Sequence, residues 1–100
     1  MKRRGKADGG NGRGIRRMLR AEGEVQGVGF RWTARRLAGE CGVRGMAENA
    51  YDGSVRLVVE GAAEAINRFV MLLGMQYPAA EIAVTGRDAP AAGLEGFEIR

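Results

Sequence analysis

Two segments with helical periodicity, each set between segments with strand alternation, place the strongest constraint on the fold of this chain. The first stripe is followed by Gly42, a residue type that commonly ends helices, and it comprises Phe30, Ala34, Leu37, Ala38 and Cys41. The second stripe, over residues 62–73, is followed by Gly74 and comprises Ala62, Ala65, Ile66, Phe69, Val70 and Leu73. Both segments are therefore predicted to be amphipathic helices.

Strand alternation covers the segments around these helices. Residues 15–23, 43–48 and 55–60 read as strands, Ile82 and Val84 mark a fourth, and Phe97 and Ile99 mark a short last one after a loop at 89–93. Asp52-Gly53, between the second and third strands, is typical of a hairpin turn. The order β-α-β-β-α-β predicts a ferredoxin-like α+β sandwich, with two helices on one face of an antiparallel sheet. The predicted core includes Ile66, Phe69, Leu73, Phe97 and Ile99.

The net charge of +4 is concentrated at the start of the chain. Residues 1–14 hold five basic residues, one acidic residue and many glycines, so we predict a disordered basic tail at 1–14 and a folded domain at 15–100. The tail is interpreted as an extension without a role, or as a weak contact for an acidic partner. Because the domain itself carries no net charge, nucleic-acid binding is not expected.

The usual side chains of metal and nucleophile chemistry are scarce. The chain has no histidine and one cysteine, Cys41, which excludes Ser-His and Cys-His pairs and an internal disulfide. We therefore expect no metal and no cofactor, and a reducing, cytoplasmic location. No run approaches the roughly 20 apolar residues of a membrane span, so no membrane association is expected.

The segment from Gly23 to Arg31 joins a strand to a helix start and carries the first candidate site. Its glycines allow backbone N–H groups to turn inward as an anion-binding nest, and the helix start adds unpaired N–H groups. Arg31 adds a planar charged group suited to phosphate oxygens. The spacing matches neither the Walker loop nor the dinucleotide fingerprint, so a nucleotide site is not indicated. The nest residues are Val25, Gln26, Gly27, Val28, Gly29 and Phe30.

Other polar and aromatic residues read as structural on these grounds. Asn49, just before the hairpin, has the chemistry of an ordinary turn residue. Trp32 is predicted to pack in the core, with an exposed or half-buried position in the wall of the pocket as the alternative. Cys41 is predicted to be an inert buried thiol, and Arg35-Arg36 to form a solvated helix face.

Two motifs alter this interpretation. Residues 25–31, VQGVGFR, resemble the acylphosphatase signature VQGVxFR, and residues 45–55, GMAENAYDGSV, resemble the second signature of that family, GxVxNxxDGxV. The ending GFEIR is similar to the closing strand of the family, so the resemblance covers about residues 15–100. It implies the sandwich fold and the metal-independent hydrolysis of a small acyl phosphate, by a protein that we expect to be a monomer.

The resemblance also implies roles for individual residues. Arg31 would bind phosphate, the amides of 25–30 would cradle it, and Asn49 would orient the attacking water. Glu24 stands where relatives often carry a basic residue, and Glu48 adds a second negative charge beside Asn49. We expect both to oppose an anionic substrate, while Ala47 in place of valine costs a little packing.

Two alternatives remain. One is a carbamoyl-phosphate-handling domain, similar to the acylphosphatase-like module of hydrogenase maturation factors, although that module sits in a much larger protein. The other is a noncatalytic anion-binding or RNA-binding module on the same fold. RNA binders of this type present aromatic side chains on the sheet, which the alternation at 55–60 does not supply.

Overall fold

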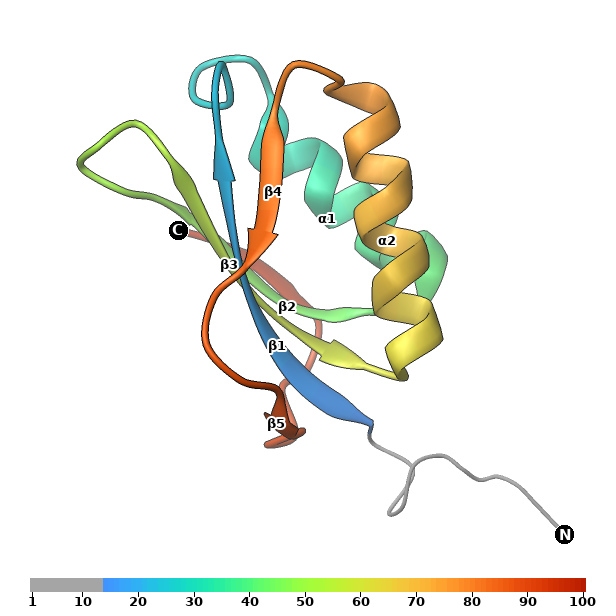
Figure 1. The fold of residues 1–100 in the computed structure, drawn as a ribbon. Coiled ribbons are helices and arrows are strands. Elements are labelled where there is room, and N and C mark those ends of the chain that lie inside the picture. The colour runs from blue at the N-terminus through green and yellow to red at the C-terminus, as the bar shows by residue number, and fades with distance from the viewer. Residues whose placement is uncertain (1–13) are drawn as a thin grey trace, which may run out of the picture.

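The computed structural model describes residues 14–100, and these form six strands and two helices (Figure 1). The predicted disorder of the basic tail falls on residues 1–13, outside the described residues. Gly14, which the prediction assigned to the tail, accepts a hydrogen bond from the amide of Ala91. The elements are β1 (Ile15–Glu22), α1 (Phe30–Cys41), β2 (Arg44–Asn49), β3 (Val55–Gly61), α2 (Ala63–Gln76), β4 (Glu81–Val84), β5 (Ala89–Pro90) and β6 (Phe97–Ile99).

The strands build one sheet in the order β4-β1-β3-β2-β6, with β5 paired to the start of β1, and both helices cover the same face (Figure 1). The ferredoxin-like prediction is confirmed. One pair departs from an antiparallel sheet, because β6 runs parallel to β2 with Gly45 opposite Phe97 and Ala47 opposite Ile99. The segment assigned to a loop at 89–93 contributes the two-residue strand β5.

The core lies between the sheet and the two helices. Ile66, Phe69 and Leu73 of α2 are completely buried, as predicted, whereas Phe97 and Ile99 are only partly buried because β6 is a sheet edge. Burying a side chain of this size contributes roughly 1.5–3 kcal/mol. The other buried apolar residues come from β1, α1, β2, β3 and the segments beside them: Leu19, Ala21, Val25, Phe30, Ala34, Leu37, Ala38, Val43, Ala47, Val55, Leu57 and Val59.

The helix ends differ in how well the sequence predicts them. Gly42 ends α1 in the left-handed conformation, with φ 74° and its amide bonded to the carbonyl of Ala38, as predicted. The prediction that Gly74 stops α2 is wrong, since α2 continues to Gln76. The helix ends instead at Tyr77, whose φ of −129° reflects the steric restriction that the following Pro78 imposes. Neither helix of the described chain is long and apolar enough to cross a membrane.

The central pair of strands sets the positions of two loops. β1 and β3 pair antiparallel over seven positions, from Ile15 opposite Gly61 to Ala21 opposite Val55. The chain therefore leaves β1 at the same end of the sheet at which it enters β3. The segment before α1 and the hairpin before β3 meet there.

A buried carboxylate organises the opposite end. Glu60 is fully buried and accepts hydrogen bonds from Arg16 Nε at 2.9 Å and from the amides of Ala92, Gly93 and Leu94 at 2.8–3.0 Å. Burial alone would raise the pKa of this carboxyl, but the amide and guanidinium donors outweigh it and hold the pKa at about 2. Glu60 thereby fixes the segment that leads into β6.

Replacing this carboxylate provides a test of stability and of its pH dependence. We expect Glu60→Gln to lower the free energy of unfolding at pH 7 by about 2 kcal/mol or more, because the charged hydrogen bonds from three backbone amides to this buried carboxylate are lost. The folded pKa of about 2 lies below the ordinary value of 4.5. The stabilisation is therefore complete above pH 4.5 and is lost as pH falls toward 2.

Urea unfolding of wild type, Glu60→Gln and the exposed control Glu95→Gln at pH 7 and pH 3 measures this effect. The difference in the free energy of unfolding between wild type and Glu60→Gln should be smaller at pH 3 than at pH 7. An equal difference at both pH values would contradict the conclusion that the ionised form of Glu60 stabilises the fold.

Candidate active site

The segment between β1 and α1 is anchored by its ends and open in its middle. Val25 and Phe30 are buried, with the Phe30 ring 4.9 Å from that of Tyr77. Gly27 and Gly29 lie between them with φ of 76° and 78°, a region that favours glycine. Nothing lies within 4 Å of a Cβ placed at either glycine, so backbone conformation rather than space requires glycine here.

The amides of this segment are available to a ligand. Within residues 14–100, no hydrogen bond of ordinary geometry is donated by a backbone N–H from residue 26 to residue 32, and the first such bond comes from Thr33 to the carbonyl of Gly29. Gly29 caps α1 without a side-chain hydrogen bond. A row of unpaired N–H groups at a helix N-terminus attracts an anion, because the helix dipole adds to the N–H charges.

Side chains from distant elements hold this segment in place. Gln26 Nε2 donates to the carbonyls of Ala50 and Ser54, at 2.9 and 2.8 Å, and so ties the segment to the β2–β3 hairpin. Tyr77 Oη, at the end of α2, donates to the carbonyl of Val28 at 3.2 Å. Sequence reasoning assigned Gln26 only a backbone role and did not single out Tyr77, because neither contact follows from periodicity or local spacing.

The hairpin itself is fixed by Asp52, as its Asp-Gly sequence predicts. The carboxylate accepts from the amide and the hydroxyl of Ser54, at 3.0 and 2.6 Å, and it also pairs with Arg20. The Ser54 hydroxyl and amide, followed by Arg20, hold the pKa of Asp52 at about 2. The turn is therefore built around an ionised carboxylate at neutral pH.

Arg31 lies on the first turn of α1, directly after the amide row, and is partly exposed. Its Nη1 donates to the backbone oxygen of Arg100 at 2.5 Å, and the amide of Arg100 donates to the carbonyl of Ala47. The guanidinium is thus held against β6 and the end of β2.

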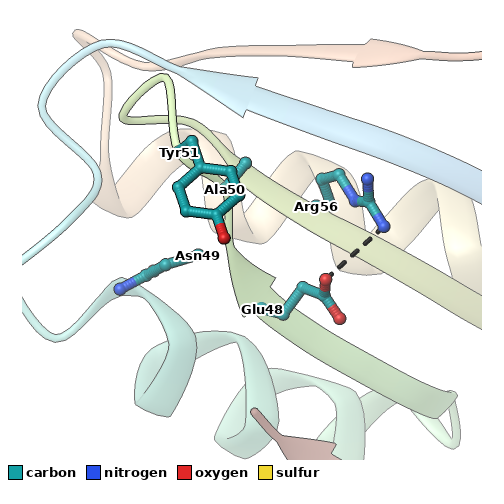
Figure 2. A pocket seen from close by; sticks show the side chains of 5 residues that line it. All are labelled: Glu48, Asn49, Ala50, Tyr51 and Arg56. Atoms are coloured by element: carbon teal, nitrogen blue, oxygen red, sulfur yellow. Dashed lines mark hydrogen bonds and ion pairs between the residues drawn. The ribbon is translucent and has the colours of Figure 1, made fainter.

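Asn49 is the last residue of β2, and its side chain is exposed. It lines a pocket of about 340 Å³ together with Glu48, Ala50, Tyr51 and Arg56 (Figure 2). Ala50, the next residue in the chain, also lines this pocket, and its carbonyl accepts the hydrogen bond from the Gln26 side chain of the amide row. The structure therefore gathers Arg31, Asn49 and residues 25–30 at one end of the sheet.

The two acidic residues that depart from the family pattern have different surroundings. Glu48 forms an ion pair with Arg56 at 3.4 Å, so its charge is partly compensated. Glu24 is exposed and makes no hydrogen bond or ion pair within residues 14–100. Of the two, Glu24 is the uncompensated negative charge beside the amide row.

The prediction that Trp32 packs in the core is wrong. Trp32 is 61% exposed, and the Arg35 guanidinium lies 5.4 Å from the centre of its ring. The buried face of α1 begins with Phe30, and a residue two positions later points to the opposite side of a helix. Arg36 pairs with Glu40 on the solvated face, as predicted, while Cys41 is only partly buried. No group of three or more metal-ligating side chains occurs in the described part of the chain.

The fold and the site together define a ferredoxin-like sandwich with an amide-lined anion site at a helix N-terminus. The family model for acylphosphatase matches residues 17–99. An acylphosphatase of Thermotoga maritima is 41% identical over 83 residues, which cover 82% of this chain and 92% of that protein. The chain therefore belongs to the acylphosphatase family.

Solved structures agree with this assignment. The crystal structure of acylphosphatase from Bacillus subtilis superposes with a TM-score of 0.77 at 29% identity, covering 86% of this chain and 98% of that one. A HypF structure from Thermococcus kodakarensis gives a TM-score of 0.67 at 34% identity and covers 85% of this chain but 11% of that longer chain. The same architecture thus also occurs as a small part of a larger protein.

Removing the Gln26 carboxamide tests how the amide row is held. We expect Gln26→Ala to lower the free energy of unfolding by about 1–2 kcal/mol, because two hydrogen bonds to carbonyl oxygens are lost. We also expect faster amide hydrogen exchange at Val25 and Thr33, whose N–H groups are bonded to the carbonyls of Gly23 and Gly29 in this segment, with no change in the core of α2. Arg36→Ala, which removes a surface ion pair, is the control. Unchanged exchange at Val25 and Thr33 would show that Gln26 does not fix the segment.

Proposed function

We propose that this chain hydrolyses acyl phosphates, and that the row of unpaired amides beside Arg31 is where the phosphoryl group binds. The observation that carries the proposal is this row, in which none of the seven consecutive N–H groups from residue 26 to residue 32 donates a hydrogen bond of ordinary geometry within residues 14–100. Membership of the acylphosphatase family supports the acyl phosphate as substrate. The activity is assigned to residues 15–100.

Binding and charge neutralisation follow from the chemistry of these groups. The amides are directed hydrogen-bond donors, and the Arg31 guanidinium is a charged donor of matching geometry. Together they stabilise charge on the equatorial oxygens in the transition state, which is most of what phosphoryl transfer requires. We therefore propose that the reaction proceeds without a metal.

The attacking water is assigned to Asn49. A carboxamide can both donate and accept a hydrogen bond, so it can orient a water although it is no strong base. The water oxygen forms a bond to phosphorus as the bond between phosphorus and the acyl oxygen breaks. The carboxylate leaves with the bonding electron pair, and the water loses a proton to the phosphate product or to solvent. A carboxylate is a good leaving group, so no general acid is required.

The RNA-binding alternative has less support. On the sheet face away from the helices, Met18, Val58 and Met46 lie directly opposite one another in register. This row carries no aromatic ring on which a base could stack. We therefore favour acyl phosphate hydrolysis over RNA binding, and we propose separately that the protein acts as a cytoplasmic monomer.

The proposed activity is tested with benzoyl phosphate in the presence of EDTA. Wild type should hydrolyse it, and Arg31→Ala should lose about 10²-fold or more in kcat/KM together with inhibition by inorganic phosphate, because a charged phosphate donor is removed. Arg35→Ala, one turn further along α1, is the matched control and should remain active. The proposal fails if wild type has no activity under these conditions.

The division of roles between the two residues is tested separately. Asn49→Ala should reduce kcat about 10²-fold while leaving the inhibition constant of inorganic phosphate unchanged, because the amide row and Arg31 remain. Asn67→Ala, which removes an exposed carboxamide on α2, is the control. An equal loss of phosphate inhibition in Asn49→Ala would assign Asn49 to binding instead.

A further inference from the structure

We infer that the pocket beside Asn49 receives the acyl group of the substrate, and that Tyr51 selects uncharged, aromatic acyl groups there. This inference rests on the proposed function and extends it to the part of the substrate that the phosphate site does not contact. It is carried by the position of the pocket, by the pairing of its charges and by the exposure of the tyrosine.

The position of the pocket follows from that of Asn49. This side chain lines the pocket, which has a volume of about 340 Å³ and is large enough for a small organic group. Gln26 ties the phosphate-binding segment to Ala50, which lines the same pocket. An acyl phosphate whose phosphoryl group lies on the amide row can therefore place its acyl group beside Asn49.

The charges of the pocket are already paired with each other. Arg56 Nη2 lies 3.4 Å from Glu48 Oε2, and Figure 2 shows this ion pair on one side of the pocket and Asn49 on the other. An anionic acyl group would place a second negative charge beside Glu48, next to an Arg56 charge that Glu48 already partly neutralises. An uncharged acyl group leaves the ion pair intact, so the pocket favours it.

Tyr51 offers the only aromatic surface among the residues that line this pocket. Its side chain is fully exposed, is absent from the core and has no hydrogen bond within residues 14–100. The backbone that carries it is nevertheless held, because the amide of Ala50 bonds to Ser54 and Asp52 closes the turn. A fully exposed ring on a fixed hairpin beside Asn49 is free to stack on a flat acyl group.

Kinetics with benzoyl, acetyl and succinyl phosphate test the inference. Wild type should have a lower KM for benzoyl phosphate than for acetyl phosphate, and no lower KM for the anionic succinyl phosphate than for acetyl phosphate. Tyr51→Ala should raise the KM for benzoyl phosphate about 3- to 10-fold, the loss expected for one aromatic stacking contact, without changing that for acetyl phosphate. Tyr51→Phe should retain the preference of wild type.

Trp32→Ala is the matched control, because Trp32 is the other strongly exposed aromatic residue near the site. If Trp32→Ala removes the benzoyl preference and Tyr51→Ala does not, the inference is overturned. A lower KM for succinyl than for acetyl phosphate also overturns it. Both results leave the proposed function intact, because that proposal fails only if wild type has no activity on benzoyl phosphate.

Discussion

The pairing of β1 with β3 is the constraint on which the site depends. Its register places Ala21 opposite Val55, so the chain leaves one strand and enters the other at the same end of the sheet. Two segments separated by more than 20 residues in sequence meet there, and the Gln26 carboxamide joins them. A shift of one residue in this pairing would turn the buried residues of one strand to the outside, so the apolar alternation that forms the core also fixes the site.

Contacts at the opposite end of the sheet help to position Arg31, through the segment that leads into β6. Glu60 binds three consecutive amides in the segment before this strand, and β6 then runs parallel to β2 as far as Ile99. The next residue, Arg100, accepts a hydrogen bond from Arg31 with its backbone oxygen. A guanidinium at a helix start would otherwise have many conformations, and fixing it costs side-chain entropy. This contact positions the cation without occupying all of its five donors.

Few charged groups determine the electrostatic potential of the site. Positive potential comes from backbone amides and one guanidinium, while Glu48 and Asp52 are paired with Arg56 and Arg20 on the hairpin. Glu24, at the edge of the amide row, has no ion-pair partner within residues 14–100. Because it is exposed, its opposition to an anionic substrate is subject to screening by salt.

The sequence by itself determined the order of elements, the helix faces, the hairpin and the glycine segment, because each depends on local periodicity or on the backbone freedom of particular residues. It also predicted Arg31 to be an anion-binding residue, whereas the catalytic role of Asn49 was predicted from family resemblance alone. Local spacing gave the wrong end for α2, because the restriction imposed by Pro78, and not Gly74, ends this helix. It also gave the wrong environment for Trp32, because this residue lies opposite the buried face of α1. Only the tertiary structure decided the contacts of Gln26, Tyr77 and Glu60 and the parallel placement of β6, because these join residues that no local pattern relates.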